Sequence, residues 1–568
     1  MGVIKTTIGD YLLKRIKELG IDTIFGVPGD FNMKFLDLIE DDPDLVWGNN
    51  ANELNAAYAA DGYARVKGAG CVVTTFGVGE LSATNGIAGS YSEMVPVIHI
   101  VGTPKTSSQA SGAILHHTLG NGDFNVFMNM FASITAAHVH LTSTEAARQI
   151  DTVINESMRR RRPGYIGIPI DIIGDEIEVE DNPLSYAVPK NPADVQAAAI
   201  KAIMDLIHQA KNPIVIADAC VQRNHLEKEL HAFLQTSGFP SFVAPMGKGT
   251  IDPVTPGFRG CFSGAVSLPQ ILEEVKQADL VLQFGAVLTD FNTGGFTGVL
   301  DRGNVVSLHT FATYVQYSNY EGVGMKELVP LLTAQFPATA RRSVQTYEQK
   351  WGPRAIRPPA QPGTGMIQDY FWEVANKYMA ANAIIVVETG TVEFASINFD
   401  GPPGASFISQ VMWGSIGFSL PAALGAAIAD RSRRVYLLVG DGSFQLTAQE
   451  VSVMLHHGVT PVILLFNNDG YVIEKMIHGP TRKYNDFQMW NYAKSFDYFG
   501  ADLPVNQSRA VAPFKIGVHE RVTTRADFDK AMAQTNQQPD CIHFLELIFP
   551  RDDVPQEVLL QTATSENK

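Results

Sequence analysis

The chain carries short apolar runs, four to six residues long, that alternate with longer stretches of helical periodicity. Short apolar runs bounded by glycine, proline or polar residues predict buried strands, and the stretches between them predict helices. Strands that alternate with helices are typical of α/β domains built on parallel sheets. The predicted strands are Thr23–Val27, Cys71–Thr75, Val97–Val101, Tyr165–Ile168, Pro213–Ala217, Leu280–Phe284, Val305–Leu308, Ala383–Val387, Val435–Val439, Val462–Phe466 and His543–Ile548.

Two stretches interrupt this alternation and have the composition of linkers. Asn182–Pro192 contains three prolines, and Gly352–Gly365 contains four prolines and three glycines. Proline and glycine break regular elements, so we expect domain boundaries there. We therefore predict three consecutive α/β domains with mainly parallel sheets, at residues 1–182, 193–345 and 365–568.

Composition narrows the class of protein. Of 568 residues, 45% are hydrophobic and 18% are charged, as expected of a globular protein with large cores. No apolar run approaches the length of about 18 residues that a membrane span needs. The net charge of −16 argues against nucleic acid or an anionic membrane as a partner. The start lacks a secretion signal, and the four cysteines are far apart without a metal-binding pattern, so we expect a reduced, cytoplasmic protein.

Two of the predicted strands lead into polar turns that could bind a phosphate and a metal ion. One is followed by Gly440–Ser443 (Gly-Asp-Gly-Ser) and the next by Asn467–Gly470 (Asn-Asn-Asp-Gly), with a helix predicted between them over Gln445–His457. In a βαβ unit both strands end at one edge of the sheet, so Asp441 and Asn468, 27 positions apart, can converge there. Their oxygens suit Mg²⁺, and the glycines suit a nearby phosphate. Taken singly, each motif is more often an ordinary turn.

Glu53 begins an alanine-rich apolar stretch and has two interpretations. Asn50, three residues earlier, would make Glu53 part of a capping box at a helix start. A carboxyl group packed beside apolar side chains would instead have its pKa raised by desolvation and could serve in acid–base chemistry.

Four further side chains are suited to proton transfer. His116 and His117 are adjacent, so they can reach one site only from a loop, which the glycines after them supply. A lone histidine pair is, however, more often ordinary than catalytic. Asp30 follows a predicted strand and could equally cap a helix, and Glu474 could be an acid near the phosphate site or a solvated helix residue.

Longer runs of the sequence resemble one enzyme family. Gly-Asp-Gly-Ser followed by Asn-Asn resembles the diphosphate-binding motif of thiamine-diphosphate enzymes. Six further runs, spread over essentially the whole chain, resemble the fungal type of pyruvate decarboxylase: Phe25–Asn32, Asn52–Arg65, Thr75–Glu80, His116–Phe124, Gln410–Phe418 and Ile473–Pro480. These motifs are long, and they are ordered and spaced as in that family.

The resemblance implies the non-oxidative decarboxylation of a 2-keto acid, with pyruvate giving acetaldehyde and carbon dioxide. Thiamine diphosphate would carry the chemistry through an ylid and an enamine, and Mg²⁺ would hold its diphosphate. The three predicted domains would then be an aminopyrimidine-binding domain, a middle domain of regulatory type, and a diphosphate- and magnesium-binding domain.

The resemblance also implies roles for individual residues. The catalytic residues would be Glu53, Asp30, His116, His117 and Glu474, and the metal ligands would be Asp441, Asn468 and the carbonyl of Gly470. The cofactor-binding residues would be Glu53, Thr391, Gly414, Ile416, Asp441, Gly442, Ser443, Asn468, Gly470, Tyr471 and Ile473. Among them, Ile416 would bend the cofactor, and the Gly414 carbonyl would accept a hydrogen bond from its 4′-amino group.

Residues that resemble the substrate pocket leave the preferred substrate open. Phe291, Ile473 and Ile477 suggest a small apolar group, whereas Glu393 replaces a small residue of the relatives and would alter the pocket or point away. Larger 2-keto acids, such as indolepyruvate or phenylpyruvate, are the alternative. More distant alternatives are acetohydroxyacid synthase, which shares the three-domain plan and binds FAD, and a structural assembly protein that has kept the fold.

The family builds each active site between two subunits. One chain would supply Glu53, Asp30 and the histidines, and the other would supply Asp441, Asn468 and Glu474. The resemblance therefore implies a homodimer at minimum and a homotetramer as in relatives. Cys220 resembles the middle-domain cysteine of members that are activated by substrate, whereas Met94 replaces the histidine that relays the signal.

Overall fold

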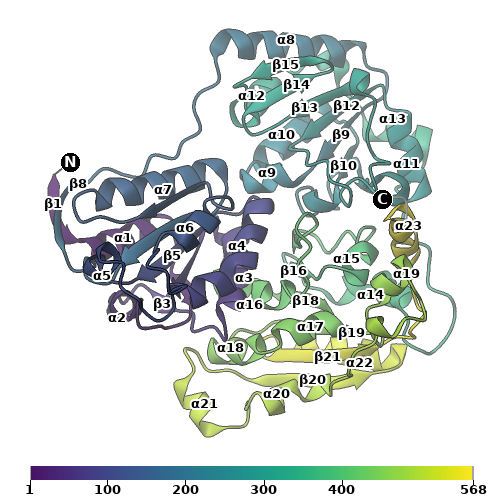
Figure 1. Cartoon of the computed structure of the whole chain (residues 1–568). Coiled ribbons are helices and arrows are strands. Elements are labelled where there is room, and N and C mark those ends of the chain that lie inside the picture. The colour runs from purple at the N-terminus through teal and green to yellow at the C-terminus, as the bar shows by residue number, and fades with distance from the viewer. Residues whose placement is uncertain (1, 566–568) are drawn as a thin grey trace.

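The structure is a computed structural model that describes residues 2–565 and contains three large sheets surrounded by helices. Figure 1 shows an N-terminal domain in purple and blue at the left, a middle domain in teal at the upper right, and a C-terminal domain in green and yellow below it. Each domain combines a largely parallel sheet with helices, which confirms the predicted fold class. The domain boundaries stay a prediction, and their outermost bounds, residues 1 and 568, lie outside the described residues.

The N-terminal domain has a six-stranded, fully parallel sheet in the order β3-β2-β4-β5-β7-β6. Its strands are β2 (Thr23–Gly26), β3 (Val46–Trp47), β4 (Gly70–Thr75), β5 (Val97–Thr103), β6 (Ala137–His140) and β7 (Gly164–Pro169), and β1 (Val3–Thr7) pairs separately with β8 (Glu176–Glu180). Its helices are α1 (Ile8–Glu18), α2 (Met33–Asp41), α3 (Glu53–Lys67), α4 (Val78–Ser92), α5 (Thr106–Ala110), α6 (Val126–Phe131) and α7 (Ala146–Arg160).

The middle domain has a seven-stranded mixed sheet in the order β11-β10-β9-β12-β13-β14-β15. The pairs β13–β14 and β14–β15 are antiparallel, and the other neighbouring strands are parallel. Its strands are β9 (Pro213–Ala217), β10 (Ser241–Val243), β11 (Phe258–Cys261), β12 (Leu280–Phe284), β13 (Val305–Leu308), β14 (Ala312–Val315) and β15 (Ser318–Glu321). Its helices are α8 (Ala193–Gln209), α9 (Ala219–Arg223), α10 (Glu227–Ser237), α11 (Pro269–Lys276), α12 (Met325–Ala334) and α13 (Val344–Trp351), with short 3₁₀ turns η1 (Pro245–Gly247), η2 (Gly264–Val266), η3 (Arg302–Asn304) and η4 (Ala338–Ala340).

The C-terminal domain has a six-stranded, fully parallel sheet in the order β17-β16-β18-β19-β21-β20. Its strands are β16 (Ile384–Val387), β17 (Ser406–Ile408), β18 (Val435–Gly440), β19 (Val462–Asn467), β20 (Ile516–Val522) and β21 (Ile542–Ile548). Its helices are α14 (Gln368–Tyr378), α15 (Thr391–Ala395), α16 (Ser419–Ala429), α17 (Asp441–Thr447), α18 (Glu450–His456), α19 (Val472–Ile477), α20 (Ser495–Tyr498), α21 (Pro504–Arg509), α22 (Arg525–Gln537) and α23 (Gln556–Ser565), with 3₁₀ turns η5 (Lys483–Asn485) and η6 (Tyr492–Lys494).

One predicted helix is wrong in its start and its continuity. Instead of a single helix over Gln445–His457, α17 begins at Asp441 and α18 ends at His456, with a break between them. Asp441 in the first turn favours an early start because an acidic side chain complements the positive end of the helix dipole. The phosphate-binding turn of the prediction is therefore itself the first turn of a helix.

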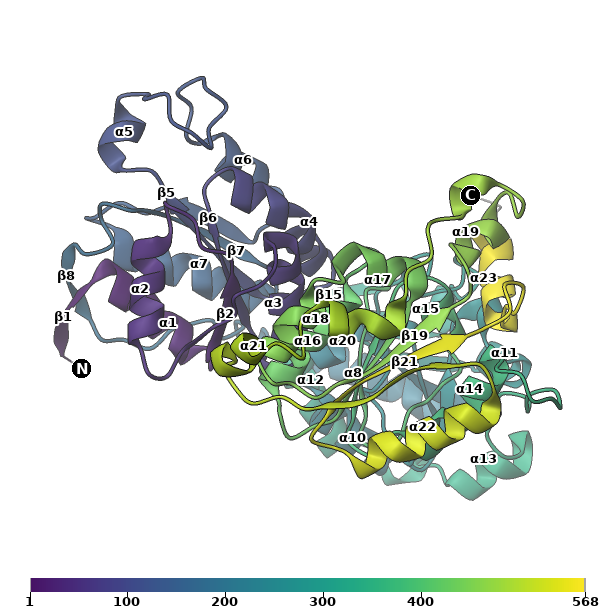
Figure 2. The same ribbon diagram turned by 90° about the horizontal axis from the view of Figure 1, so that it is seen from below.

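Helix α3 of the N-terminal domain packs closely against α16 of the C-terminal domain, and the two lie side by side in Figure 1 and Figure 2. A Cβ atom added at Gly425 of α16 would lie 1.9 Å from the Ala59 carbonyl oxygen. One added at Gly62 of α3 would lie 2.2 Å from the Ala422 carbonyl oxygen. Glycine at these two positions therefore allows the helix backbones to touch.

Polar contacts tie the same two domains together. The fully buried Glu450 carboxylate accepts hydrogen bonds from the side-chain amides of Asn50 and Asn55, the latter at 2.8 Å. The His457 ring nitrogen Nε2 lies 2.8 Å from the Gly48 carbonyl oxygen. These contacts hold the start of α3 in a defined position beside the C-terminal domain.

Buried apolar residues form two large clusters. The first joins the N-terminal domain to one side of the C-terminal sheet, and the second joins the middle domain to the other side. Among residues 2–565, no helix is both long and apolar enough to cross a membrane.

Candidate active site

Asp441 and Asn468 lie at the ends of neighbouring parallel strands, β18 and β19. The Asp441 carboxylate accepts hydrogen bonds from the backbone N–H groups of Gly442 at 2.8 Å and Gly470 at 3.2 Å. Asp441, Asn468 and Gly470 line one pocket. The structure thus brings together the three residues predicted to bind the metal ion.

The Asp441 carboxylate is buried and forms no ion pair within the described residues. The residue is 2% exposed. Burial raises its pKa to about 6, and backbone N–H groups offset the shift only in part. A divalent cation would favour the ionised carboxylate. With the Asn468 amide and the Gly470 carbonyl, Asp441 offers the oxygen ligands that Mg²⁺ takes together with water and phosphate, so these residues fit that ion.

Backbone geometry shapes this pocket. Asp469 and Gly470 have positive φ values of 61° and 125°, which turn the chain sharply after β19. A Cβ atom added at Gly442 would lie 2.5 Å from the ring of Tyr471. The absence of a side chain at Gly442 therefore allows this turn to pack directly against the ring of Tyr471.

Most of the other predicted cofactor-binding residues line the same pocket. They are Thr391, Ile416, Gly442, Ser443, Tyr471 and Ile473. Gly414 lies two residues before Ile416 in a loop with a φ of 65° and does not line the pocket. Glu53 does not line it either, because every lining residue belongs to the C-terminal domain.

Glu388 positions the loop that carries Ile416, and the sequence interpretation missed it. The residue follows β16 and is 1% exposed. One carboxylate oxygen accepts hydrogen bonds from the N–H groups of Thr389 (3.1 Å) and Gly417 (3.2 Å), and the other accepts them from the Ser419 N–H (3.2 Å) and hydroxyl (2.6 Å). Burial raises the Glu388 pKa to about 7. The sequence did hold a signal for Glu388, because an acidic residue directly after an apolar strand is a candidate functional residue.

Glu93 supports the same loop from the N-terminal domain. Its Oε1 atom accepts hydrogen bonds from the N–H groups of Met412 at 2.8 Å and Trp413 at 3.0 Å. The side chain is 1% exposed. Nothing in the sequence around Glu93 indicated this contact, which joins residues more than 300 positions apart.

Glu53 is the first residue of α3, and the helix cap belongs to a neighbour. Asn52 is the N-cap and accepts a hydrogen bond from the Asn55 N–H at 2.8 Å, so the predicted capping box from Asn50 is wrong. The half-buried Glu53 carboxylate has its pKa raised by burial. A Cβ atom added at Gly79 would lie 3.0 Å from its Oε1 atom, so the carboxylate rests against the backbone of α4.

Asp30, His116 and His117 lie together at the surface of the N-terminal domain. His116 Nε2 is 2.6 Å from Asp30 Oδ2, and His117 Nε2 is 3.9 Å from Asp30 Oδ1. His116 stacks on Phe31 with ring centroids 5.1 Å apart. His117 has a φ of 63°, which turns the two adjacent rings toward one carboxylate. The structure therefore brings these three predicted catalytic residues together.

Glu474 does not join them within one chain. It lies on α19 with its side chain exposed. In both Figure 1 and Figure 2, α19 lies on the opposite side of the molecule from α5 and from the loop between α5 and α6, which carries the two histidines. The N-terminal and C-terminal groups of the predicted site are thus separate in the single chain.

The predicted substrate-pocket residues divide between two places. Ile473 lines the Asp441 pocket, and Ile477 lies one turn further along α19. Phe291 and Glu393 instead line a second, small cavity with Lys248. Glu393 is 6% exposed, and neither carboxylate oxygen has a hydrogen bond of good geometry within the described residues. Burial, with Glu93 and Glu388 nearby, raises its pKa to about 8.

Cys220 lies at the start of α9, where its Sγ atom is 3.6 Å from the Met94 sulfur. Burial raises the pKa of the Cys220 thiol to about 11, so it is neutral at neutral pH. All four cysteines are buried and free.

Three sequence-family models match the chain in order. They are the "Thiamine pyrophosphate enzyme, N-terminal TPP binding domain" at residues 6–126, the "central domain" at residues 200–317, and the "C-terminal TPP binding domain" at residues 388–544.

Curated fungal proteins are similar along the whole chain. The pyruvate decarboxylase of Kluyveromyces marxianus is 40% identical over 562 residues, which cover 98% of this chain and 97% of the relative. Pyruvate decarboxylase isozyme 3 of Saccharomyces cerevisiae is 40% identical over 566 residues, with the same coverage. The pyruvate decarboxylase of Aspergillus terreus is 40% identical over 572 residues, which cover 99% of this chain and 97% of the relative.

Proposed function

This chain belongs to the thiamine pyrophosphate enzymes and, within them, to the pyruvate decarboxylase family, and from that premise we propose that it converts pyruvate to acetaldehyde and carbon dioxide. The observation that carries this proposal is the meeting of Asp441, Asn468 and Gly470 in one pocket whose oxygen ligands suit a metal-bound diphosphate. Thiamine diphosphate, when bound, supplies a carbon nucleophile for the keto group and accepts the electrons that carbon dioxide leaves behind.

We propose that Asp441, Asn468 and the Gly470 carbonyl would hold Mg²⁺, which would supply positive charge for the cofactor's diphosphate. The Ser443 N–H lies in the first turn of α17, where the helix dipole favours an anion, while the Gly442 N–H already donates to Asp441. Glu388 holds the loop that presents Ile416 to the same pocket. These residues would position the cofactor and exclude water from it.

Glu53 is assigned the proton exchange with the cofactor's pyrimidine ring. Its carboxyl group is half-buried against the α4 backbone, which raises its pKa and eases proton uptake. A glutamine at this position would keep the shape of the side chain but could not exchange the proton.

Asp30, His116 and His117 are assigned the later proton transfers to the reacting carbon. The 2.6 Å contact between His116 Nε2 and Asp30 Oδ2 fixes the orientation of the imidazole ring. We propose that Glu474, on α19 of a second chain, joins Asp30 and the two histidines in one active site. Carboxyl and imidazole groups are side chains that can act as general acids and bases.

We further propose that the working form is at least a homodimer, and a homotetramer as in relatives. The Asp441 pocket is lined only by the C-terminal domain, while Asp30 and the two histidines lie together in the N-terminal domain, with Asp30 and His116 exposed and His117 half-buried. Two chains in a symmetric pair would bring each half to the other. The free, buried cysteines accord with the cytoplasmic location proposed for the protein.

Release of carbon dioxide from pyruvate, measured with and without thiamine diphosphate and Mg²⁺, tests the proposal. We expect turnover only when both are present and a slower reaction with phenylpyruvate. Glu53→Gln should bind the cofactor but lose about 100-fold or more in turnover. Near-normal turnover in that variant, or equal turnover without the cofactor, would contradict the proposed function.

A further inference from the structure

Asp30, His116 and His117 have the arrangement of a metal-binding site as well as that of proton-transfer groups. One ligand atom of each residue lies within 4.8 Å of the ligand atoms of the other two. Both Nε2 atoms face the Asp30 carboxylate, that of His116 at 2.6 Å and that of His117 at 3.9 Å. Among residues 2–565, this is the only group of three or more histidine, cysteine or acidic side chains arranged in this way.

The backbone and one aromatic ring hold the two histidines in place. The φ of 63° at His117 turns adjacent side chains, which diverge in regular structure, toward one carboxylate. A Cβ atom added at Gly77, the N-cap of α4, would lie 2.0 Å from the His117 carbonyl oxygen, so the histidine loop packs directly on this helix end. The Phe31 ring stacks on His116 and meets His117 edge-on, with centroids 5.1 and 6.2 Å apart. The two imidazoles are therefore ordered before any ion binds, which lowers the entropy cost of binding.

The cluster is open to an incoming ion. The side chains of His116, His117 and Asp30 are 59%, 32% and 42% exposed. In the described part of the chain, no lysine or arginine forms an ion pair with Asp30. Its negative charge is therefore available to a cation, and solvent can supply further ligands.

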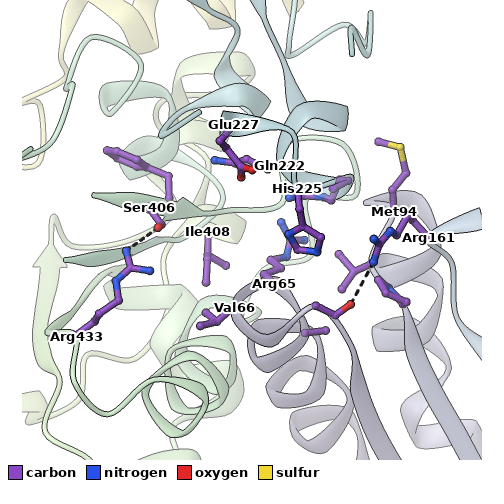
Figure 3. A pocket seen from close by; sticks show the side chains of 16 residues that line it. Arg65, Val66, Met94, Arg161, Gln222, His225, Glu227, Ser406, Ile408 and Arg433 are labelled. Atoms are coloured by element: carbon purple, nitrogen blue, oxygen red, sulfur yellow. Dashed lines mark hydrogen bonds between the residues drawn. The ribbon is translucent and has the colours of Figure 1, made fainter. Parts of the chain in front are cut away.

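A second place where a histidine and a carboxyl group lie at one cavity is much less suited to a cation. His225 and Glu227 line a cavity of about 220 Å³ between the three domains. Figure 3 shows three arginine side chains around it, namely Arg65, Arg161 and Arg433. Burial and the nearby Arg161 lower the pKa of His225, which shows how strongly this cavity opposes positive charge. The Asp30 cluster has no such cations paired with it.

We propose that Asp30, His116 and His117 bind Zn²⁺ through two imidazole nitrogens and one carboxylate oxygen, with water completing the ligand set. Zn²⁺ takes histidine and aspartate ligands, and its open sites have three protein ligands and a water molecule. Ligand atoms around a tetrahedral Zn²⁺ are about 3.3 Å apart, so no distance within the cluster has to change by more than about 1.5 Å.

This site differs in chemistry from the Asp441 pocket. Imidazole nitrogens suit Zn²⁺ and similar transition metals, whereas Mg²⁺ prefers the carboxylate and carbonyl oxygens that Asp441, Asn468 and Gly470 offer. Mg²⁺ at a saturating concentration should therefore fill the Asp441 pocket and leave the two histidines free for Zn²⁺.

The consequence for turnover rests on the proposed function. Bound Zn²⁺ occupies the Nε2 lone pairs of His116 and His117, and a proton held at either nitrogen passes to solvent when the ion binds. Neither Nε2 atom can then exchange a proton with the reacting carbon. We therefore expect Zn²⁺ at a saturating concentration to slow carbon dioxide release from pyruvate by about tenfold or more.

Calorimetric titration of the full-length protein with zinc chloride tests the site, with thiamine diphosphate and Mg²⁺ kept saturating. His117→Gln and Asp30→Asn should each weaken Zn²⁺ binding by about tenfold or more. His138→Gln is the matched control, because His138 is exposed on β6 outside the cluster, and this variant should bind Zn²⁺ like the wild type. Thiamine diphosphate binding that matches the wild type shows that each variant is folded.

Co²⁺ in place of Zn²⁺ identifies the ligands. Co²⁺ with imidazole ligands in a four- or five-coordinate site absorbs visible light more strongly than Co²⁺ surrounded by six oxygens. We expect this stronger absorption in the wild type, its loss in His117→Gln, and its loss when Zn²⁺ is added.

Three results would overturn the metal site. They are equal Zn²⁺ affinity in His117→Gln and wild type, a loss of affinity in His138→Gln as large as in His117→Gln, and a Co²⁺ spectrum of oxygen ligands alone. Unchanged turnover with Zn²⁺ bound would instead contradict the proton-transfer role of the histidines, and the metal site itself would stand.

Discussion

At the scale of single residues, three buried carboxylates differ in the groups that surround them. Asp441, Glu388 and Glu393 are all nearly inaccessible to water, but their partners differ. Asp441 is bound by backbone N–H groups at a strand end, and Glu388 holds a loop through four hydrogen bonds. Glu393 has no hydrogen bond of good geometry in the described residues. The environments of Glu393 and Asp441 therefore lead to different expected effects when each is substituted.

Glu393→Gln should make the protein more stable at alkaline pH. Glu393 titrates near 4.5 when unfolded and at about 8 when folded, so the folded state holds the extra proton between these values. The stability that this proton provides is full below pH 4.5 and is lost as the pH rises through 8. We expect the variant's thermal midpoint to exceed that of the wild type by several degrees above pH 8, and less at mildly acidic pH. Glu348→Gln, at an exposed position, is the control, and parallel pH profiles for wild type and Glu393→Gln would contradict the burial argument.

Asp441→Asn should separate metal binding from folding. The amide removes the buried negative charge, so the protein without metal should be at least as stable as the wild type above pH 6, the pKa of the carboxyl group. Magnesium-dependent binding of thiamine diphosphate should weaken by at least about tenfold, measured by calorimetry. Asp469→Asn changes a neighbouring side chain that is 58% exposed and should bind the cofactor normally. Equal cofactor affinity in Asp441→Asn and wild type would exclude Asp441 as a metal ligand.

The two residues that support the Ile416 loop show which parts of the site the sequence could indicate. Glu388 directly follows an apolar strand, a position where functional groups are expected in parallel sheets, so its contribution was open to prediction. Glu93 reaches Met412 and Trp413 from another domain, and no local pattern marks such a contact. Residues that act through local motifs were predictable, and those that act through tertiary packing were not.

At the scale of elements, the α3–α16 contact is the tightest junction between domains. A methyl group at Gly425 would lie 1.9 Å from the Ala59 carbonyl oxygen, so one helix would have to move. Gly425→Ala should lower the free energy of unfolding by about 1–3 kcal/mol or more, seen as a lower thermal midpoint. Gly174→Ala, where an added methyl group meets nothing within 4 Å, is the matched control. Equal midpoints in the two variants would contradict the close packing.

Periodicity predicted every long buried strand, because those strands are continuous apolar runs. It missed ten strands that are short or largely polar: β1, β3, β6, β8, β10, β11, β14, β15, β17 and β20. The predicted helix before Gly458 was wrong because a single periodic stretch cannot reveal the break between α17 and α18. The approach of α3 to α16 was equally hidden, since small residues are a signal only when the partner helix is known.

At the scale of the whole molecule, the two groups of predicted catalytic residues lie on opposite sides. Asp30 and the two histidines belong to the N-terminal domain, while Glu474 and the Asp441 pocket belong to the C-terminal domain, whose helix α19 lies on the opposite side of the molecule from α5 (Figure 1 and Figure 2). The buried contacts between α3 and α16 and around Glu450 join the N-terminal and C-terminal domains of one chain. In the proposed homodimer, a second copy of the chain would supply the missing half.

Mixing two inactive variants tests this account most directly. Glu53→Gln and Glu474→Gln subunits are dissociated, mixed in equal amounts and reassembled, and carbon dioxide release from pyruvate is measured. If each site takes Glu53 from one chain and Glu474 from the other, half of the dimers are hybrids and each hybrid has one intact site. The mixture should then recover about one quarter of wild-type turnover. No recovery, despite proven subunit exchange, would contradict a decarboxylase site assembled from two chains.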